Sequence, residues 1–532
     1  MKQNFCKIIL LSAFLCIGAS LTAQQVPRPR TIITTDGEVD DADSFIRLLL
    51  YSNDLNIEGI VYSSSQHHWA GDGKGSLLKP LNRVSMPGFP VQEPKEEISH
   101  RWIGTSWVQE IIADYAQCYP NLIKHDKRYP TPESLYSLVK IGNIEVEGDM
   151  RNPTEGSEWI KNIILDDNPD KVYLEAWGGT NTIARALLSI EEEYKSTPKW
   201  NDIYQKVSEK AVIHIIQDQD GTYRNYVAKN WPNIKVIYNR LQFFCFAYLW
   251  NTIVPEPLQK YLKGDWMLQN IKEGHGPLAA HYYCLGEGYD LHDPDDHFGE
   301  PEAPERMQQQ LHNFISEGDS PSYFVLLDFG LRNINHPDWG GLGGRYVSSS
   351  QHPNVFIDPQ LPGGAGRLWG PKREEQKPST EKVKFDRSQG DYNPYTDEVD
   401  MFYPQSRWVG VLQNDFAARA DWCVKDYIAA NHSPSVTVEG SLDIQTAAGT
   451  TISLKASATD PDGNQLSYKW WQYREAGNSD LIIKITNKNS PVTTIELPDD
   501  APLGASFHLI LEVSDNGTPS LTRFQRVIIT IK

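Results

Sequence analysis

Residues 31–51 read TIITTDGEVDDADSFIRLLLY, and residues 57–65 read IEGIVYSSS. The β-branched run Thr31–Thr35 predicts a strand, and the apolar spacing of Asp43–Tyr51 predicts an amphipathic helix. Ile57–Ser63 then predicts a second strand. A strand, a helix and another strand in this order are typical of a parallel sheet covered by helices. The stretch therefore predicts an α/β fold.

The same alternation continues to about Leu327. The further predicted elements are the strands Val172–Trp177, Ala211–Ile216 and Lys235–Tyr238 and the helix Thr182–Leu188. Residues 340–406 are rich in Gly, Pro and charge and predict irregular structure, whereas Gln405–Ala430 predicts a closing helical segment. Ligands of such sheets bind beyond the carboxyl ends of the strands. The residues that follow each strand are therefore the candidates for a site.

The sequence changes character after Asn431. Seven short β-patterned runs lie between residues 435 and 531, separated by turn signals such as Asp460-Pro461-Asp462-Gly463. This pattern predicts a small immunoglobulin-like sandwich, so we expect an α/β domain over residues 24–432 and a β domain over 433–532. The run ATDPDGNQLSYKWW resembles cadherin-like modules of extracellular enzymes. Asp460, Asp462 and Asp515 then correspond to Ca²⁺-site positions, or they are ordinary turn residues.

Composition limits the function classes. The 532 residues carry 50 Lys and Arg against 69 Asp and Glu, a net charge of −19. This acidity argues against a nucleic-acid partner and against anionic membrane surfaces. Hydrophobic residues make up 39% and charged residues 22%, as in globular proteins. The six cysteines form no CxxC pair, which argues against a structural zinc site.

The first residues have the pattern of a secretory signal peptide. Lys2 and Lys7 precede the apolar run Ile8–Ile17, and small or polar residues follow. We predict that residues 1–23 are removed and that the protein is exported to the periplasm or the extracellular space. No later run reaches the roughly 18 apolar residues of a membrane span, so we expect no membrane insertion.

Four carboxylates fall within six residues in the segment Asp36-Gly37-Glu38-Val39-Asp40-Asp41. The segment lies between a predicted strand and a predicted helix. Two explanations fit it: an acidic helix cap in solvent, or a site for a hard divalent cation such as Ca²⁺, which would relieve the repulsion between like charges.

The segment IITTDGEVDDAD resembles the metal-binding signature of inosine-uridine nucleoside hydrolases. The resemblance implies that Asp36 and Asp41 bind Ca²⁺ and that Asp40 is the general base for the attacking water. EAWGGTNTIA, residues 175–184, resembles a second motif of that family. It implies that the Thr180 backbone carbonyl binds the metal, and it places Asn181 beside the substrate. SSSQ gives Gln66 as a further substrate-binding candidate.

Four positions depart from the family pattern. Thr34 stands where the family has its first Asp, and Gly37-Glu38 replaces Pro-Gly. In Glu317-Gly318-Asp319, Asp319 fits the last metal ligand, or it is a helix-cap or turn residue. Gly318 stands where the family has the His that protonates the leaving group. His275 or His336 could substitute as the acid, although a lone His is more often structural.

Over residues 30–430 the chain more closely resembles a subgroup of secreted bacterial nucleoside-hydrolase-like proteins described as cellulose-binding. The matching stretches include TTDGEVDDADSFIRLLL, WGGTNTIARAL, EGDSPSYF, HPDWGGLGGRY and QNDFAARADW. The subgroup also carries a small C-terminal β domain after ANHSP.

Other loops would complete a sugar-binding pocket. Asp218, Asp220 and Asn225 follow the strand Ala211–Ile216 and offer groups for sugar hydroxyls. Aromatic residues stack on sugar rings, and Trp339, with Trp69 and Trp177, flanks the motif loops. All three could instead pack within loops.

The leading hypothesis is an exported Ca²⁺-dependent hydrolase that cleaves a glycosidic bond of a glycan-derived sugar by water attack at the anomeric carbon. One alternative is a non-catalytic carbohydrate-binding protein, and a second is a periplasmic nucleoside hydrolase. The expected partner is an oligo- or polysaccharide fragment, and the sequence is compatible with a homo-oligomer.

Overall fold

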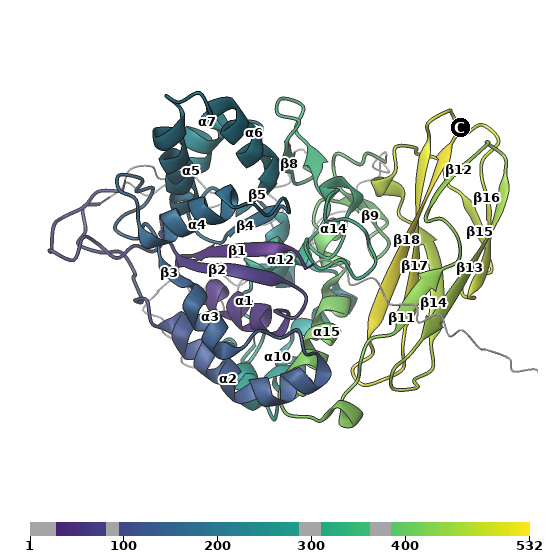
Figure 1. The fold of residues 1–532 in the computed structure, drawn as a ribbon. Coiled ribbons are helices and arrows are strands. Elements are labelled where there is room, and N and C mark those ends of the chain that lie inside the picture. Colours follow the sequence, from purple (N-terminus) through teal and green to yellow (C-terminus); the bar gives the residue numbers. More distant parts are fainter. Residues whose placement is uncertain (1–27, 81–94, 287–309, 362–384) are drawn as a thin grey trace, which may run out of the picture.

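The computed structural model describes residues 28–80, 95–286, 310–361 and 385–532. Within these ranges an α/β domain is followed by a β-sandwich (Figure 1). The predicted signal peptide lies outside the described residues and stays a prediction. No helix in the described part of the chain is long and apolar enough to cross a membrane.

The α/β domain is built on an eight-stranded sheet in the order β3-β2-β1-β4-β5-β6-β8-β7. Every pairing is parallel except that of β7 with β8. The strands are β1 (Arg30–Thr35), β2 (Asn56–Tyr62), β3 (Val139–Ile141), β4 (Val172–Ala176), β5 (Ala211–Ile216), β6 (Lys235–Asn239), β7 (Val347–Ser348) and β8 (Val355–Ile357). The predicted α/β class, with a mostly parallel sheet, is confirmed.

Both faces of the sheet are covered because neighbouring residues of a strand point to opposite sides. Ile32 joins the apolar cluster under α4 and α5, whereas Ile33 joins the cluster under α1 and α2. Figure 1 shows α4–α7 on one face and α1–α3 on the other. The helices are α1 (Val39–Leu50), α2 (Trp107–His125), α3 (Pro132–Leu138), α4 (Glu155–Leu165), α5 (Asn181–Tyr194), α6 (Trp200–Lys210), α7 (Ala228–Asn230), α8 (Trp250–Ile253), α9 (Glu256–Gln259), α10 (Gly264–Met267), α11 (Gly276–Ala280), α12 (Ser320–Phe324), α14 (Tyr403–Ser406) and α15 (Val409–Trp422).

Helix α1 begins four residues earlier than predicted. Glu38 is its N-cap, and the Glu38 side chain accepts a hydrogen bond from the backbone N–H of Asp41 while the Asp41 side chain accepts one from that of Glu38. This reciprocal capping box satisfies two backbone donors at the helix start. The acidic residues Asp40 and Asp41 therefore lie inside the first helical turn rather than in a loop.

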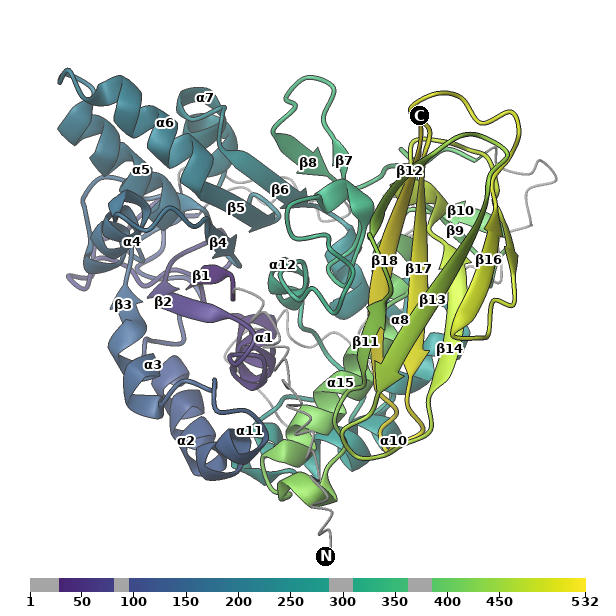
Figure 2. The same ribbon diagram turned by 45° about the vertical axis from the view of Figure 1, so that its right-hand side comes forward.

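The C-terminal part forms two four-stranded sheets, β11-β13-β16-β15 and β12-β18-β17-β14 (Figure 2). Its strands are β11 (Ser435–Val438), β12 (Asp443–Thr446), β13 (Thr451–Thr459), β14 (Ser467–Gln472), β15 (Lys484–Thr486), β16 (Val492–Glu496), β17 (Ser506–Ser514) and β18 (Thr522–Ile531). The prediction missed β12, a short strand of alternating half-buried and exposed residues that is held by parallel pairing with β18. The two-stranded sheet of β9 (Asp391–Asn393) and β10 (Glu398–Asp400) lies in the segment predicted to be irregular.

The sandwich packs on the α/β domain through a buried interface. Tyr473, Ile510 and Phe524 belong to the same apolar cluster as the core around α1 and α15. The backbone N–H of Phe524 donates to the carbonyl of Phe329 at 2.8 Å, so β18 extends onto the segment that follows α12. Arg526, fully buried, donates at 2.9 Å to the Trp339 carbonyl in the same region. The sandwich is therefore part of the folded body rather than a loosely tethered module.

A buried ion-pair network joins α15 to β18. Asp415 accepts hydrogen bonds from Arg419 at 2.8 Å and from Arg523 at 2.9 Å. Burial alone would raise the pKa of Asp415, but the charges of Arg523 and Arg419 outweigh burial and hold the pKa at about 2. An Asp in the unfolded chain has a pKa of about 3.9. The network thus favours the ionised, folded state.

We expect Asp415→Asn to destabilise the protein by about 3–5 kcal/mol at pH 7, because it leaves two arginines without their buried partner. Of this loss, about 2.6 kcal/mol depends on pH. The depressed pKa contributes stability above about pH 4, and that stability is lost as the pH falls toward 2. Urea unfolding of both proteins should therefore show a stability difference that is constant from pH 7 to 5 and shrinks below pH 4.

Asp443→Asn is the matched control, because the Arg332–Asp443 pair also joins the two domains, at 2.7 Å, but is 64% exposed at the Asp. Its loss should cost about 1 kcal/mol or less. An Asp415→Asn difference that is as large at pH 3 as at pH 7 would contradict the proposed role of the network.

Candidate metal centre and active site

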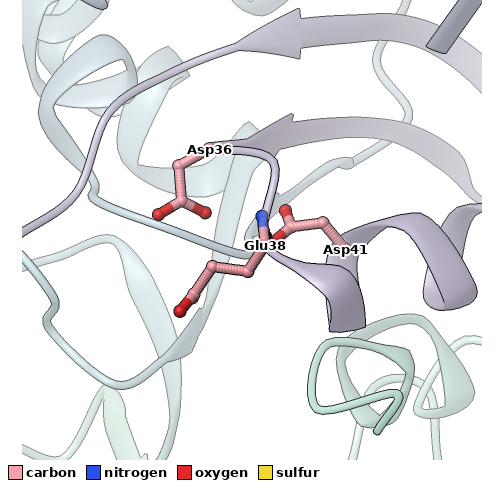
Figure 3. Close-up of side chains that lie close together, drawn as sticks. All are labelled: Asp36, Glu38 and Asp41. Atoms are coloured by element: carbon pink, nitrogen blue, oxygen red, sulfur yellow. Dashed lines mark hydrogen bonds between the residues drawn. The ribbon is translucent and has the colours of Figure 1, made fainter. Parts of the chain in front are cut away.

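The acidic turn joins the carboxyl end of β1 to the start of α1. Asp36 follows β1 directly, and Gly37 turns the chain with a φ of 89°, which favours glycine. Figure 3 shows Asp36 at the strand end and Asp41 on the first turn of the helix, with Glu38 between them. The Thr35 hydroxyl donates to one oxygen of Asp41, and the Glu38 N–H donates to the other at 3.1 Å. The turn therefore holds its carboxylates in fixed positions.

Asp36 is a buried carboxylate whose oxygens have no hydrogen-bond partner among the described residues. It is 0% exposed, and neither of its oxygens accepts a hydrogen bond from the part of the chain that the structure describes. Oδ1 of Asp40 is likewise buried without a partner there. Buried polar groups of native proteins are nearly always satisfied, and an unpaired buried charge is costly. A cation bound between these carboxylates would supply the missing partner.

The carboxylates form two overlapping groups that could hold a metal ion. Ligand atoms of Asp36, Glu38 and Asp41 lie within 4.8 Å of one another, and so do those of Asp40, Asp41 and Asp319. Asp41 is common to both groups. The long-range partner is Asp319, which is distant in sequence but is brought to the turn by the fold.

Burial and mutual repulsion raise the pKa values of these carboxyls. Burial, followed by the charge of Asp36, raises the pKa of Asp40 to about 7. Burial also raises the pKa of Asp319 well above its ordinary value, and the charges of Asp41 and Asp40 add to the effect. Burial raises the pKa of Asp36 as well. Because these pKa values are raised when no metal is bound, a cation that binds the carboxylates would displace protons from them.

Asp319 is held beside α1 by an anchored segment. The neighbouring Glu317 forms a fully buried ion pair with Arg47 of α1, with 2.7 Å between Nε and Oε2. The Tyr282 hydroxyl donates to the same carboxylate. Because α1 also carries Asp40 and Asp41, this pair fixes the position of Asp319 relative to them.

Gly318 leaves no room for a side chain. A Cβ atom built on it would lie 2.4 Å from Oδ2 of Asp40 and 3.3 Å from Phe243. The His that the nucleoside hydrolases have at this position therefore cannot be accommodated while Asp40 keeps its conformation. Ser316, two residues earlier, donates a long hydrogen bond of 3.4 Å to the same oxygen of Asp40.

The second predicted motif, residues 175–184, lies against Asp36 at the end of β4. A Cβ on Gly178 would lie 2.5 Å from Cγ of Asp36, so glycine permits the close approach. Thr180 is the N-cap of α5, and its carbonyl accepts the Ala184 N–H at 2.8 Å. A carbonyl oxygen has two lone pairs, so this helical bond leaves one available to a ligand.

Asn181 and Gln66 are buried beside this motif. The Asn181 amide donates to the Ser64 hydroxyl at 2.9 Å and to the Asn143 carbonyl at 2.8 Å, and its oxygen accepts from Ser63 at 2.7 Å. These bonds use the amide of Asn181 to join the loops after β2 and β4. Gln66 is 7% exposed, and its backbone N–H donates to the Gln219 carbonyl.

Asp218 and Asp220 bind backbone donors. Asp220 is 0% exposed and accepts the N–H of Asn181 at 2.9 Å, which places its charge at the N-terminus of α5. Asp218 accepts two backbone N–H groups at 3.3 Å, one of them from Tyr223. Burial, followed by the charge of Asp220, raises the pKa of Asp218 to about 7. Asn225 is exposed.

The structure places His336 and Trp339 away from the acidic turn, and their role as substrate-binding residues stays a prediction. Their rings stack at 3.8 Å, and Trp339 packs edge-on against His508 of the sandwich. Lys235, the first residue of β6, donates to the adjacent Asn335 carbonyl. This segment therefore lies at the amino end of a parallel strand, whereas Asp36 lies at a carboxyl end.

His275 is also placed elsewhere. Its Nδ1 lies 3.1 Å from Asp421 of α15, and its Nε2 lies 3.0 Å from the Gln269 carbonyl. Both contacts are outside the acidic groups. The indoles of Trp69 and Trp177 are 1% and 0% exposed, so neither offers a stacking surface.

The sequence analysis did not identify His68 as a site residue. It is fully buried, and its Nε2 lies 3.8 Å from Oε1 of Glu38. Its charge also acts on the pKa of Asp36, against the larger effect of burial. The signal was present in the sequence, since His67-His68 follows the Ser63–Gln66 run, but the fold of that loop decides which His faces the turn.

Comparison with known proteins gives the family. The sequence model described as "Cellulose-binding Sde182, nucleoside hydrolase-like domain" matches residues 30–346. The chain belongs to this family. The model described as "Cellulose-binding protein Sde0182, C-terminal domain" matches residues 451–531. No curated protein matches.

A solved structure supports the fold. A nucleoside hydrolase-related protein from Saccharophagus degradans, described as associated with carbohydrate metabolism, is 24% identical, with a TM-score of 0.65 over 95% of this chain and 100% of that chain. An outer capsid protein of bacteriophage RB49 matches over 19% of this chain and 30% of that chain at 15% identity, with a TM-score of 0.13. The predicted family, with its nucleoside-hydrolase-like domain and C-terminal β domain, is thus confirmed.

Proposed function

We propose that the protein is an exported, Ca²⁺-dependent hydrolase that cleaves a glycosidic bond of a glycan-derived sugar. The observation that carries the proposal is Asp36, whose two buried oxygens have no hydrogen-bond partner in the described residues beside Asp40 and Asp41. A buried charge arranged in this way requires a cation or a proton. Membership of a cellulose-binding family supports a carbohydrate as the substrate.

The donor set fits calcium. Both groups offer only carboxylate oxygens, and Ca²⁺ prefers six to eight oxygen ligands, whereas zinc and copper sites commonly include His or Cys. Asp36, Asp41, Asp319 and the Thr180 carbonyl would hold the ion. When bound, calcium supplies a positive charge that attracts water and sugar hydroxyl oxygens.

Asp40 would act as the general base. It lies beside the proposed ligands, and without metal its pKa of about 7 is well above that of an ordinary Asp, which favours it as a proton acceptor. Asp40 would take a proton from water as the water attacks an oxocarbenium-like anomeric carbon, and direct attack inverts the configuration. Because Gly318 supplies no acid, the substrates expected to react fastest are those whose leaving group departs without protonation.

The experiment is an assay of purified protein after chelation and after addition of Ca²⁺. Aryl glycosides with activated leaving groups, cello-oligosaccharides, inosine and uridine are offered in parallel. We expect hydrolysis of a glycoside that is lost on chelation and restored by Ca²⁺. Hydrolysis that persists after complete removal of metal would contradict the proposal, and cleavage of inosine or uridine alone would favour the nucleoside hydrolase alternative.

The second candidate is a non-catalytic carbohydrate-binding protein. Gly318 favours it, because the chain lacks the leaving-group acid of the nucleoside hydrolases at that position. Binding to insoluble cellulose by a protein that hydrolyses none of the glycosides, with or without Ca²⁺, is the result that would select this candidate.

Placing at position 318 the His of the inosine-uridine nucleoside hydrolases should lower kcat rather than raise it. In Gly318→Ala the new Cβ would meet Oδ2 of Asp40 at 2.4 Å and displace it. A misplacement of about 1 Å can lower kcat about 100-fold, and Gly318→His should be at least as damaging. Gly410→Ala on α15 is the control, since the atom nearest to its Cβ would belong to the Tyr261 side chain, at 2.9 Å, and not to the acidic groups. A Gly318→His variant with higher kcat would contradict this account of Asp40.

A further inference from the structure

A cavity lies at the opposite end of β1 from the acidic turn. Its volume is about 290 Å³, and it opens between the start of β1, the segment after α12 and β18 of the sandwich. Arg28 lines it two residues before β1, whereas Asp36 follows the last residue of that strand. A six-residue strand is about 20 Å long, so the cavity is separate from the proposed metal centre.

Three arginines from distant parts of the chain converge on this cavity: Arg28, Arg128 and Arg523. Two aspartates, Asp54 and Asp328, also line the cavity. Among the described residues the lining therefore holds three arginines and two aspartates, in a chain whose net charge is −19.

Two of the arginines are fixed by carboxylates. Arg128 binds Asp126 at 2.6 Å and also lies 3.3 Å from Asp54. Arg523 binds Asp415, and its guanidinium lies 3.7 Å from the centre of the Phe329 ring. The guanidinium N–H groups of Arg128 and Arg523 are therefore held in place by these contacts and are not free to move toward a ligand.

Arg28 differs from the other two. Within the described residues its guanidinium donates to the Arg128 carbonyl at 3.0 Å and forms no ion pair with a carboxylate. A guanidinium carries five N–H donors in a fork that matches a carboxylate. Arg28 is thus the cation on this wall that remains available to bind an anion.

The rest of the lining suits a sugar ring. Leu326, Phe329 and Ile334 give the cavity an apolar side, against which the C–H face of a pyranose can pack. The carboxylate of Asp328 offers an acceptor for hydroxyl groups on another side. A volume at the low end of the range for small-molecule sites limits the ligand to about one or two sugar units.

We propose that this cavity binds an acidic sugar of the uronate class, with the sugar carboxylate on Arg28, the hydroxyls on Asp328 and the ring against Ile334. The site lies outside the proposed catalytic centre and does not depend on catalysis. Because Arg523 belongs to β18, the α/β domain and the sandwich both contribute to it.

The test is titration of the purified protein, tagged at the C-terminus, with D-glucuronate in the presence of a chelator. Calorimetry and ligand-observed NMR should show saturable binding, and D-glucose at the same concentrations should show none. Arg28→Gln should weaken glucuronate binding about tenfold or more, since it removes a charge-assisted pair. Ile334→Trp should block the cavity while keeping the charge of Arg28.

Arg151→Gln is the matched control, because Arg151 is an exposed arginine outside the cavity that pairs with Asp149 and Glu145. It should bind glucuronate as the unaltered chain does. Glucuronate binding that is absent, that survives both cavity variants, or that is matched by acetate would overturn the proposal. The chelator separates this result from the proposed function, because metal removal should abolish hydrolysis and leave glucuronate binding intact.

Discussion

Replacing Asp41 with asparagine is expected to lower the affinity for Ca²⁺ by at least about 100-fold, beyond the 10–100-fold loss typical of residues behind the ligands. Asp41 is the carboxylate common to both candidate groups, so an ion held by either group would contact it. The metal-free variant should nevertheless be as stable as the unaltered chain or more stable. Burial and the charges of Asp36 and Asp40 raise the pKa of Asp41, which means that its ionised form opposes folding.

Asparagine can keep the local structure. Its oxygen can accept the Glu38 N–H, and its amide can donate to the Thr35 hydroxyl, so the two contacts of Asp41 survive. Thermal unfolding with and without Ca²⁺ measures both effects. At 100 times the dissociation constant a bound ligand adds about 2.7 kcal/mol to stability, so Ca²⁺ should raise the Tm of the unaltered chain and not that of the variant.

Asp202→Asn is the matched control for Asp41→Asn. Asp202 also lies in the first turn of a helix, α6, but it is exposed and outside the acidic groups. Its Ca²⁺ response should equal that of the unaltered chain. If Asp41→Asn retained the Ca²⁺-dependent rise in Tm, the acidic turn would be an ordinary helix cap and the metal centre would be excluded.

The parts of the fold and the site that the sequence predicted are those set by neighbouring residues. The strands around Ile33 and Ile215 are buried along their whole length, and their runs rich in β-branched residues are visible without a structure. The acidic turn is likewise contiguous, and a single strand-to-helix connection is enough to place Asp36 and Asp41 together.

Long-range packing decided the rest. His336 and Trp339 directly precede the segment predicted to be irregular, but His508 and Arg526 of the sandwich contact Trp339 near the amino end of β6 rather than at the carboxyl ends of the strands. Strand β12 has too few apolar residues to be recognised before its pairing with β18 is known. A lone His or Trp carries no periodic signal, so its place depends on contacts that the sequence pattern does not encode.

Asp319 shows the intermediate case. Its sequence neighbourhood fits a helix cap as well as a ligand, and it is in fact the N-cap of α12. Its approach to Asp40 and Asp41 depends on the buried pair of Arg47 with Glu317. Neither Arg47 nor Glu317 resembles a site residue by itself, although together they align the two acidic segments.

Replacing Asp40 with asparagine should lower kcat about 10²–10⁴-fold, the usual contribution of a general base, while Ca²⁺ binding is largely kept. This outcome would distinguish the role of Asp40 as general base from the role of Asp41 as metal ligand, although the two residues are adjacent. The hydrolysis rate of the unaltered chain should fall as the pH falls through the pKa of Asp40, because the base must be deprotonated. A bound cation favours the ionised carboxylate, so this fall should occur at a lower pH than the value of about 7 found without metal.

The measurement that decides the role of Asp40 is the pH dependence of kcat in both proteins at saturating Ca²⁺. Because asparagine does not titrate, the residual kcat of the variant should not fall on the acidic side of the pH profile (the acidic limb). A substitution that acts only through the structure would lower kcat at every pH and keep that limb. Ser316→Ala is the matched control, since it removes only a 3.4 Å contact with Asp40 and should keep both the limb and most of kcat. An Asp40→Asn variant with full turnover would show that another group is the general base. An Asp40→Asn variant that loses Ca²⁺ binding would show that Asp40 is a metal ligand, and the general base would then be another group beside Asp319.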